Sequence, residues 1–417
     1  MLVIKVSAWK KDIALVTETE NKIAFELKNR AYICFSPLMF ENTLYAEAKT
    51  GRGEDINEIG IVADSISGAY GKRYFDKYFI NEFGTAPSIL DRLSFIGKHG
   101  LGALEFEPSN TSSNINTKMI FSLSEFKKQS LDVYEGRGEG ELGKLIARSN
   151  SGAGGAKAKA VVDYDPTEKK IQISQKHDEI TEGYCKCIVK FNSKRGSEAE
   201  IYNTELKLEY IYYLLAEEAG INISESWLES DSEDNYCFIT KRFDIDAKGK
   251  RLHMHSLAGL LSHDASSFSM GYESLFRVGN MLSVSKADKE QMFKTMVFNL
   301  VFANRDDHSR NFSFLMDENC SWSYAPAYDL TYSASNHHLD WHQLTIDKKP
   351  AHKVRTLAMS KIAKLCDVSN PLEVLSDMIK IKESRLRELA KKYGVNEVVS
   401  QIFNDTADFD KIFRNEL

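Results

Sequence analysis

The spacing of hydrophobic and polar residues changes about halfway along the chain. In the first half, short segments in which apolar and polar residues alternate predict β-strands. The clearest of these segments are residues 160–164, 171–174, 185–191 and 236–243. In the second half, from about residue 253, longer segments with apolar residues three and four positions apart predict helices. The strongest of them are residues 286–303, residues 371–393 and a segment at the C-terminal end.

Two helices are also predicted within the strand-rich half. Ser122 is placed to cap a helix over residues 122–133, because Glu125 follows three residues later, as in a capping box. A second amphipathic helix is expected over residues 205–219, and Gly220 would end it. Strands followed by helices indicate an α+β protein with two lobes.

Composition narrows the class of protein. A chain of 417 residues is long enough for two or three domains, and 42% hydrophobic residues can fill their cores. The net charge of −6 argues against a protein that coats nucleic acid. The six scattered cysteines are expected to be reduced thiols. Lys10 and Lys11 interrupt the N-terminus before a secretory apolar region develops, and no apolar run is long enough to span a membrane. We therefore expect a cytoplasmic protein.

The most informative polar cluster is the loop at residues 304–311, followed at a distance by Asp329. Asp306 and Asn311 have four residues between them, the interval of the kinase catalytic loop, in which the Asp accepts the substrate hydroxyl proton and the Asn holds Mg²⁺. Asp307 leaves only three residues in that interval, so Asp306 is predicted to be the catalytic base. Asn311 and Asp329 are predicted to hold the metal.

The other polar residues near this loop allow more than one interpretation. His308 can brace the loop or a phosphate, but a structural hydrogen bond is the simpler explanation of a loop histidine. Arg310 is placed as a phosphate-facing cation, or it is a solvated surface residue. The histidine-rich residues 336–342 could build a hydrolase-type metal site with Asp306 and Asp307. Their spacing matches no known ligand pattern, and they lie where a kinase has its activation loop.

A second cluster has the composition of a phosphate-binding loop. Gly152, Gly154 and Gly155 stand in a stretch rich in Gly, Ala and Lys, and glycine-rich turns can aim backbone N–H groups at phosphate oxygens. A flexible linker would have the same composition. Lys190 favours the first interpretation, because a charge within the apolar segment 188–191 needs an anionic partner.

The expected partner of Lys190 is Glu209 on the following helix, in the order of the strand lysine and helix glutamate of kinases. Glu205, one turn earlier, is an alternative partner. In a further alternative, Lys190 points from the solvent face of an edge strand. The strand that ends near Arg242 and Phe243 follows where a kinase hinge would meet the adenine, so these two residues are expected beside the nucleotide.

Together these motifs resemble the HipA family of bacterial serine/threonine kinases, which are toxins of type II toxin-antitoxin modules. Residues 304–311 are similar to the family's Asn-x-Asp-x-His-x-Lys-Asn catalytic loop, and residues 325–330 to its metal-binding segment. Lys190 stands at the family's nucleotide lysine. The glycine-rich stretch that includes Ala153 and Lys159 is similar to the family's phosphate loop.

The resemblance implies a two-lobed, protein-kinase-like (HipA-like) fold with a mixed α/β N-terminal domain and a mainly α-helical C-terminal lobe. Residues 62–73 and 102–106 are similar to the family's N-terminal domain, so the likeness spans nearly the whole chain. The implied division is an N-terminal subdomain at residues 1–118, a kinase N-lobe at residues 119–245 and a helical C-lobe at residues 246–417.

The chain departs from the family pattern at two positions. In the family a serine opens the phosphate loop, and its autophosphorylation ejects the loop and silences the kinase, but Gly152 stands at that place. Ser151 and Ser149 are the candidates to replace this serine. Arg310 replaces the usual lysine, which keeps the positive charge and changes its geometry.

The resemblance implies transfer of the γ-phosphoryl group of ATP, with Mg²⁺, to a serine or threonine of a protein; aminoacyl-tRNA synthetases are the best-known family targets. It also implies a HipB-like helix-turn-helix antitoxin, through which any contact with DNA would be made. Two other functions stay open: a degraded kinase-like module that binds nucleotide or antitoxin, and a small-molecule phosphotransferase of the aminoglycoside kind. The sequence does not identify the substrate, the antitoxin or the oligomeric state.

Overall fold

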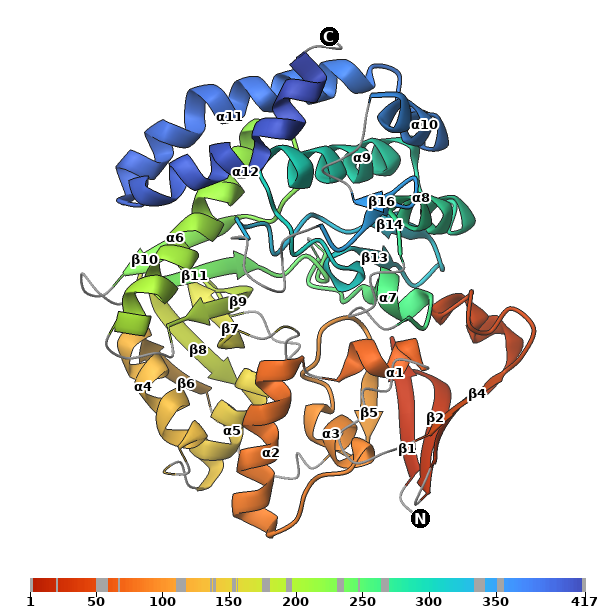
Figure 1. Ribbon diagram of the computed structural model, residues 1–417. Helices are drawn as coiled ribbons and strands as arrows, with labels where there is room; N and C mark the ends of the chain where they lie inside the picture. The colour runs from red at the N-terminus through yellow and green to blue at the C-terminus, as the bar shows by residue number, and fades with distance from the viewer. Residues whose placement is uncertain are drawn as a thin grey trace.

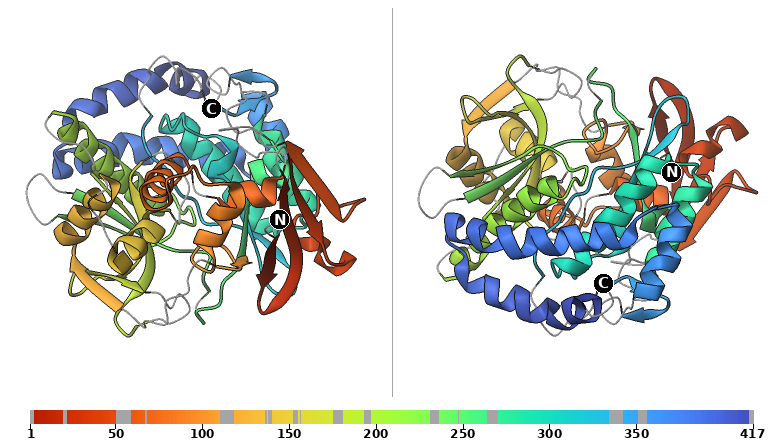
Figure 2. Two further views of the ribbon diagram at one scale, coloured as in Figure 1. Left: turned by 90° about the horizontal axis from the view of Figure 1, so that it is seen from below. Right: turned by 90° about the horizontal axis from the view of Figure 1, so that it is seen from above.

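The computed structural model describes residues 3–414 except residues 20–21, 50–58, 67, 110–117, 136, 138–139, 152–154, 156, 175–180, 193–196, 231–235, 247, 264–269, 334–341 and 351–355. Within the described residues the chain forms a small N-terminal sheet, a larger sheet and a helical C-terminal lobe. In the view of Figure 1 the larger sheet lies at the left, the N-terminal sheet at the lower right and the helical lobe above both. The N-terminal sheet (red) lies at the edge of the molecule in both views of Figure 2.

The N-terminal sheet is antiparallel and has the strand order β4-β3-β2-β1-β5. Its strands are β1 (Val3–Ala8), β2 (Lys11–Thr19), β3 (Lys22–Leu27), β4 (Tyr45–Lys49) and β5 (Glu105–Glu107). The 3-10 helix η1 (Arg30–Phe35) and the helices α1 (Gly60–Ser65) and α3 (Ile89–Ile96) contribute to its core. In β3 the buried residues Ile23, Phe25 and Leu27 alternate with more exposed ones, so one face of the strand supplies the core.

The larger sheet has the strand order β10-β11-β9-β7-β8-β6, and its strands are β6 (Lys118–Ser122), β7 (Lys159–Asp165), β8 (Lys170–Ser174), β9 (Cys185–Phe191), β10 (Ser226–Ser230) and β11 (Tyr236–Lys241). All of the predicted strands in this part of the chain are confirmed, although the last ends at Lys241 rather than Phe243. Strand β9 lies between β11 and β7. It is therefore an inner strand, paired through its backbone on both edges.

Helices α4 (Leu123–Tyr134) and α5 (Gly140–Ser151) pack against this sheet. The Ser122 hydroxyl accepts from the Glu125 N–H at 3.3 Å, and the Glu125 carboxylate accepts from the Ser122 N–H at 2.8 Å. The predicted capping box is confirmed. Helix α5 was not predicted, because its glycines, serines and asparagine hide an apolar stripe that packs into the core of the sheet.

Helix α2 (Ala69–Phe83) precedes both of these in the chain but belongs to the same core. Tyr74 and Phe75 are buried in one cluster with Val162 and Val189 of the larger sheet, and the Tyr74 hydroxyl donates to the Ser130 carbonyl at 2.7 Å. Helix α2, which precedes residue 118, thus shares a hydrophobic core with the larger sheet, and the division into domains stays a prediction.

The C-terminal lobe holds the largest hydrophobic core of the described residues. Its helices are α6 (Ser197–Glu218), α7 (Leu257–Leu260), α8 (Tyr272–Met281), α9 (Lys286–Val301), α10 (Thr356–Cys366), α11 (Pro371–Tyr393) and α12 (Asn396–Arg414). The helices predicted at 286–303 and 371–393 are confirmed, as is the terminal one. Helix α11 matches its prediction because Pro371 can begin a helix and Gly394, with a φ of +70°, can end one.

This lobe is less purely helical than the sequence pattern predicts. Strands β12 (His253–Ser256), β13 (Ser313–Met316) and β14 (Trp322–Tyr324) form a sheet, and β15 (Thr345–Ile346) pairs with β16 (Lys349–Pro350). These strands are too short to show a period of two. Helix α6 also begins earlier than expected, at Ser197 rather than Glu205.

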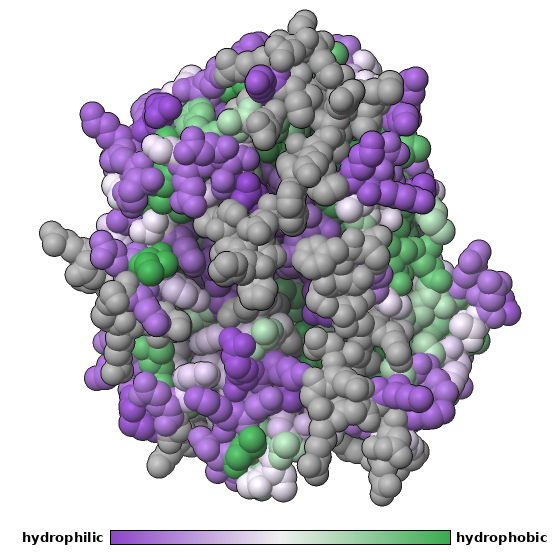
Figure 3. Space-filling view, viewed as in Figure 1, coloured by the Kyte–Doolittle hydropathy of each residue, from purple (hydrophilic) through white to green (hydrophobic). Residues whose placement is uncertain are grey.

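Surface character agrees with the composition. On the face shown in Figure 3, hydrophilic residues are widely spread and hydrophobic ones occur in small groups. None of the helices in the described part of the chain has both the length and the apolar character that crossing a membrane requires.

A buried histidine pair joins the N-terminal sheet to the C-terminal lobe. His255 Nδ1 donates to Asp64 at 2.6 Å, and its Nε2 forms a hydrogen bond with the Ser36 hydroxyl at 3.0 Å. His253 donates through Nε2 to the Phe35 carbonyl at 2.8 Å. Its Nδ1 is buried and has no hydrogen-bond partner among the described residues. Protonation of His253 would therefore place an uncompensated charge in the interface.

We expect the protein to lose stability as the pH falls from about 6.5 to about 3. Burial, helped by His255, lowers the pKa of His253 to about 3 from its ordinary 6.5. In this window the unfolded chain takes up a proton that the folded chain refuses, so the free energy of unfolding falls by about 1.4 kcal/mol per pH unit for this residue. Urea unfolding at several pH values measures the slope. His253→Gln, which cannot titrate, should have the smaller slope; equal slopes would contradict the assignment.

Candidate active site

Lys190 lies at the centre of the site. It is on the inner strand β9, and the residue opposite it on β7 is Lys159. The Lys190 side chain is buried, and its Nζ donates to both Glu209 on α6 and Asp329 in the loop after β14. The structure therefore joins three residues far apart in sequence at one amino group. It excludes the alternative of a Lys190 that points to solvent from an edge strand.

The charges of this cluster stabilise one another. Burial alone would lower the pKa of Lys190, but Asp329 and Glu209 raise it above its ordinary value. Burial would likewise raise the pKa of Asp329, but Lys190 and Lys159 hold it well below its usual range. Both groups are therefore ionised at neutral pH, as an electrostatic site for phosphate and metal requires.

Two further lysines surround the cluster. Lys157, which the sequence reasoning did not select, forms an ion pair with Glu205 at 3.1 Å. Glu205 is thus not the partner of Lys190, but it lies close by. The Lys159 side chain is buried next to Gly155, whose φ of +94° is a conformation that favours glycine. The pKa of Lys159 is lowered by its burial, although Asp329 opposes this.

Asp306 is held through its backbone and leaves its carboxylate accessible. Its N–H donates to the Ser333 hydroxyl at 3.2 Å, and its carbonyl accepts from the Asn311 amide at 2.8 Å. The side chain is 46% exposed, and His308 Nε2 lies 3.7 Å from its Oδ1. Partial burial raises the pKa of Asp306, and His308 acts in the opposite direction. A carboxylate with these properties can accept a proton from a hydroxyl that enters the site.

Asp307 has a different environment. Its side chain is fully buried, and it accepts from the Tyr272 hydroxyl at 2.6 Å, from His342 Nδ1 at 2.9 Å and from the Gln343 N–H at 2.7 Å. Asp307 therefore ties the loop to α8 and to the segment before β15. The alternative of a metal site built on Asp307 and the histidine-rich segment receives no support from His342, which is engaged here; His337 and His338 lie outside the described residues.

Asp307→Asn is expected to lower the free energy of unfolding by roughly 3 kcal/mol, because an amide cannot accept from all three donors and leaves buried groups unpaired. Asp306→Asn is the matched control, since the neighbouring carboxylate is nearly half exposed. Its stability should change by less than about 1 kcal/mol. Urea denaturation of the two variants measures the difference. If the two variants were equally stable, the hydrogen bonds of Asp307 would not be needed to hold the loop in place.

Asn311 and Asp329 present oxygen atoms that suit a hard cation. The Asn311 amide nitrogen donates to the Asp306 carbonyl, so its Oδ1 is the atom that can face a metal. Asp329 has a φ of +55°, a conformation that few non-glycine residues adopt and that Asp and Asn tolerate best. No group of three or more His, Cys, Asp or Glu side chains that could hold a metal occurs among the described residues. Two oxygen ligands completed by phosphates and water are the pattern of Mg²⁺ at nucleotide sites.

The phosphate loop is described only in part. Gly152, Ala153 and Gly154 lie outside the described residues, and Gly155 accepts from the Tyr70 N–H of α2 at 3.0 Å. Ser149 and Ser151, the candidates for autophosphorylation, are in the last turn of α5. The Ser149 hydroxyl is buried and donates to the Val161 carbonyl at 2.7 Å, so it is not accessible in this conformation.

The two hinge residues point in different directions. Phe243 packs against Tyr328, the residue before Asp329, with ring centroids 5.5 Å apart. The expectation for Arg242 has to be revised: its side chain is fully buried and donates to Asp244 and to the Gly100 carbonyl, so it faces the N-terminal part of the chain.

Sequence reasoning also missed an apolar pair beside Lys190. Val161 and Ile188 lie opposite each other on β7 and β9, on the same face as Lys190. Both are only partly buried, whereas the adjacent Val162 and Val189 are buried at 3% and 1% exposure. The sequence alone did not reveal this pair, because only the folded structure shows that these two apolar side chains are partly exposed beside Lys190. A flat apolar group such as a purine can contact them.

His308 and Arg310 border the catalytic loop. His308 is partly buried, and its Nδ1 is buried without a hydrogen-bond partner among the described residues. The Tyr328 hydroxyl donates to the Arg310 carbonyl at 2.6 Å, which connects the loop to the segment that carries Asp329. The Arg310 side chain is also partly buried.

Comparisons with known proteins identify the family to which the chain is similar. Residues 151–407, more than half of the chain, match the model of the HipA-like C-terminal domain family. A candidate kinase of Haemophilus influenzae is 25% identical over 128 residues, which are 28% of this chain and 37% of that protein. The match thus spans little more than a third of that relative's length.

Two solved structures match the chain, one of them well enough to compare the fold. The complex of Shewanella oneidensis HipA with HipB and operator DNA contains a chain that matches with a TM-score of 0.64 and 14% identity, over 99% of this chain and 97% of the other. The likeness confirms the expected HipA-like, kinase-like fold. The Helicobacter pylori proinflammatory kinase CtkA matches with a TM-score of 0.40 and 15% identity, over 63% of this chain and 94% of the other.

Proposed function

The chain belongs to the family defined by the HipA-like C-terminal domain, and from this membership we propose that it is a Mg²⁺- and ATP-dependent serine/threonine protein kinase that acts as the toxin of a toxin-antitoxin module. The observation that carries the proposal is the contact of Lys190 with both Glu209 and Asp329. A buried amino group between a helix carboxylate and a loop carboxylate is the arrangement with which kinases hold nucleotide phosphates.

The residues around this contact take distinct roles in the proposed reaction. Asp306 accepts the proton of the substrate hydroxyl, and its exposed carboxylate supports this role. Lys190 and Lys157, each paired with a glutamate, neutralise phosphate charge. Asn311 and Asp329 hold Mg²⁺, which supplies charge neutralisation at the β- and γ-phosphates when ATP is bound.

Nucleotide selectivity would come from the apolar surface next to Lys190. Val161 and Ile188 form one side of the proposed adenine site, and Phe243 with Tyr328 forms another. The glycine-rich residues 152–155 would cover the phosphates. Arg310 and His308 border the proposed phosphate site from the loop that carries Asp306.

We further propose a HipB-like antitoxin as the partner and a protein serine or threonine, such as one of an aminoacyl-tRNA synthetase, as the acceptor. The similar Shewanella oneidensis chain was solved with HipB and operator DNA, which supports a partner of that kind. The acidic net charge of −6 supports DNA contact through the partner rather than through this chain. Growth arrest on expression that a neighbouring small helix-turn-helix protein relieves would favour the toxin over a small-molecule phosphotransferase.

The test of the kinase proposal is incubation of the purified protein with radiolabelled ATP, Mg²⁺ and a bacterial protein extract, followed by phosphoamino-acid analysis. Label on serine or threonine supports the proposal. Nucleotide binding without transfer would indicate the degraded module. A parallel incubation in which an aminoglycoside replaces the extract tests the small-molecule enzyme, and label on the aminoglycoside but not on protein would indicate it. Phosphoproteomics after brief induction would then identify the acceptor.

Autophosphorylation is expected at Ser151, one residue before the place of the family serine. Peptide mass spectrometry after incubation with Mg²⁺ and ATP should find the phosphate there rather than on Ser149, because the Ser149 hydroxyl is buried. Ser151→Ala should abolish the modification, and Ser149→Ala is the control that should keep it. If the protein phosphorylates its substrate while this loop stays unmodified, the proposed regulation by autophosphorylation is wrong.

A further inference from the structure

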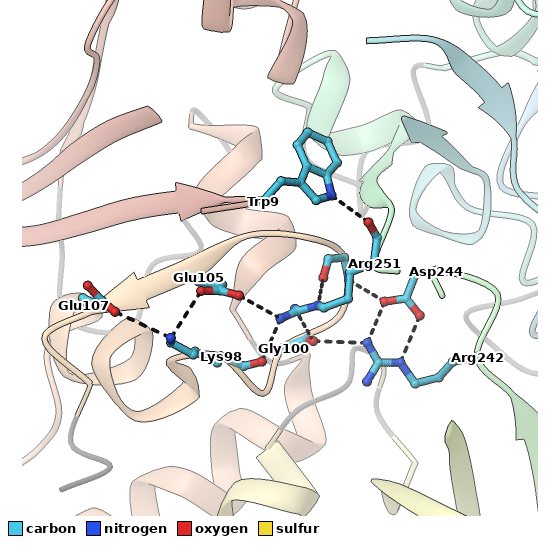
Figure 4. A network of polar contacts seen from close by, with 9 residues as sticks. Trp9, Lys98, Gly100, Glu105, Glu107, Arg242, Asp244 and Arg251 are labelled. Atoms are coloured by element: carbon cyan, nitrogen blue, oxygen red, sulfur yellow. Dashed lines mark hydrogen bonds and ion pairs between the residues drawn. The ribbon is translucent and has the colours of Figure 1, made fainter. Parts of the chain in front are cut away.

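A polar cage joins the N-terminal part of the chain to the segment between β11 and β12. We call residues 97–103 the N-terminal loop and residues 242–252 the hinge segment. Figure 4 shows the contacts between them. Arg251 donates through Nε to the Gly102 carbonyl at 2.6 Å, through Nη1 to Lys98 at 2.8 Å and through Nη2 to Gly100 at 2.9 Å. Each nitrogen of one guanidinium thus binds a different carbonyl of the same loop.

A second guanidinium completes the cage. Arg242 donates to both oxygens of Asp244, at 2.9 and 2.7 Å, and to the Gly100 carbonyl at 3.3 Å. Asp244 also accepts from the Gly102 N–H at 2.6 Å. The Gly100 carbonyl is therefore shared by the two arginines, and Gly102 is bound through both its N–H and its carbonyl.

The cage leaves little freedom of movement. The side chains of Arg242 and Asp244 are 0% and 3% exposed. Gly102 has a φ of +75°, and a Cβ there would lie 3.0 Å from the Met254 nitrogen, so the loop touches the start of β12. Burial alone would raise the pKa of Asp244, but Arg242 lowers it, so the carboxylate stays charged. Buried charges with complete hydrogen bonding fix a geometry more firmly than surface pairs do.

The hinge segment carries Phe243 between the two caged residues. Arg242 and Asp244 both point to the N-terminal loop, and Phe243 points the other way, to Tyr328. The Arg242 N–H also donates to the Lys186 carbonyl at 2.9 Å, which continues the alignment of β11 with β9. The position of the Phe243 ring is thus determined by contacts made on the opposite side of the chain.

We propose that Arg251 and the N-terminal loop are positioning elements for adenine recognition: they hold the hinge segment so that Phe243 presents its ring to the nucleotide. The inference rests on the proposed function, because it assumes that the site binds ATP. Arg251 binds the carbonyls of the N-terminal loop, and this loop binds Arg242 and Asp244, so the effect of Arg251 would be exerted through these two residues and Phe243.

The test compares ligands that use different parts of the site. Binding of Mg²⁺-ADP and of Mg²⁺-tripolyphosphate to the full-length protein is measured by calorimetry for the wild type and for Arg251→Ala. We expect ADP affinity to fall by about tenfold or more, because small misplacements of a contact are costly, while tripolyphosphate affinity stays within about twofold. If Arg251 had only a structural role, its replacement would lower the affinities for both ligands equally or change neither affinity. Either result would overturn the proposal.

Two controls make the outcome specific. Arg92→Ala removes an ion pair with Asp76 at 2.5 Å that also lies in the N-terminal part but does not reach the hinge segment. It should leave the affinities for both ligands unchanged. Phe243→Ala should itself lose ADP affinity, and the addition of Arg251→Ala to it should cause little further loss, since both act on one contact.

Two results need separate interpretation. If Arg251→Ala does not fold, Arg251→Lys takes its place, because lysine keeps the charge but cannot bind three carbonyls at once. An adenine-selective loss is again expected, and unchanged ADP affinity in the folded variant would overturn the proposal. A wild-type protein that binds tripolyphosphate but not ADP would equally overturn it. A wild-type protein that binds neither ligand would instead refute the proposed function.

Discussion

Replacing Asp306 with asparagine is expected to reduce phosphoryl transfer to protein by about 100- to 10,000-fold, because the loss of a general base has that range of effect. The amide has the same shape but cannot take the hydroxyl proton. The backbone contacts of residue 306 with Ser333 and Asn311 do not involve the carboxylate, so they are retained. Initial rates with radiolabelled ATP measure the effect.

Asp306→Asn should also bind Mg²⁺-ADP as the wild type does and unfold at a similar urea concentration. These two measurements separate lost chemistry from lost structure. Asp307→Asn provides the contrast, because this variant should unfold at a clearly lower urea concentration than the wild type. If the Asp306→Asn variant were fully active, Asp306 would not be the catalytic base, and residues 304–311 could no longer be assigned as the catalytic loop.

Asp329→Asn is expected to lower the transfer rate by roughly 100- to 1,000-fold, the size of effect seen when one electrostatic contact to the transition state is removed. The variant loses a charged oxygen ligand and also loses the anionic partner of Lys190. Asparagine is the best replacement for this test because, next to glycine, it tolerates a positive φ best, so the backbone stays unstrained.

The measurement for Asp329→Asn is the transfer rate as a function of Mg²⁺ concentration. A metal ligand should shift the concentration that gives half-maximal rate upward, whereas a residue that only supports the fold should not. Asp317→Asn, which alters a surface turn in the same lobe, serves as the control. An unchanged Mg²⁺ dependence would contradict the role of Asp329 as ligand.

The sequence was most informative where local chemistry determines structure. The boundaries of α11 follow from Pro371 and Gly394, and the start of α4 follows from Ser122 and Glu125, because these residues satisfy helix ends within a few positions. The pairing of Lys190 with Glu209 was also predictable, since a buried cation on a strand needs an anion within reach.

Other features depend on contacts that no local pattern reveals. Helix α5 is stable because Leu145 and Ile146 pack on a sheet formed later in the chain, and its glycines gave the opposite signal. The direction of Arg242 could not be assigned from sequence, because besides Asp244 it binds a carbonyl 142 positions away, that of Gly100. The engagement of Asp307 likewise needs Tyr272 and His342, which are 35 residues to either side.

The placement of α2 has a consequence for how the chain is made on the ribosome. Its buried face packs mainly on α5 and α4, which are synthesised after it: Tyr74, for example, donates to the Ser130 carbonyl of α4. Until those two helices emerge, Phe75 can pack on Phe95 of α3, but Tyr74 lacks its partners on α4. An aromatic face that waits for its cover is a condition in which nascent chains aggregate or recruit chaperones. Rare codons placed before α5 would prolong this interval.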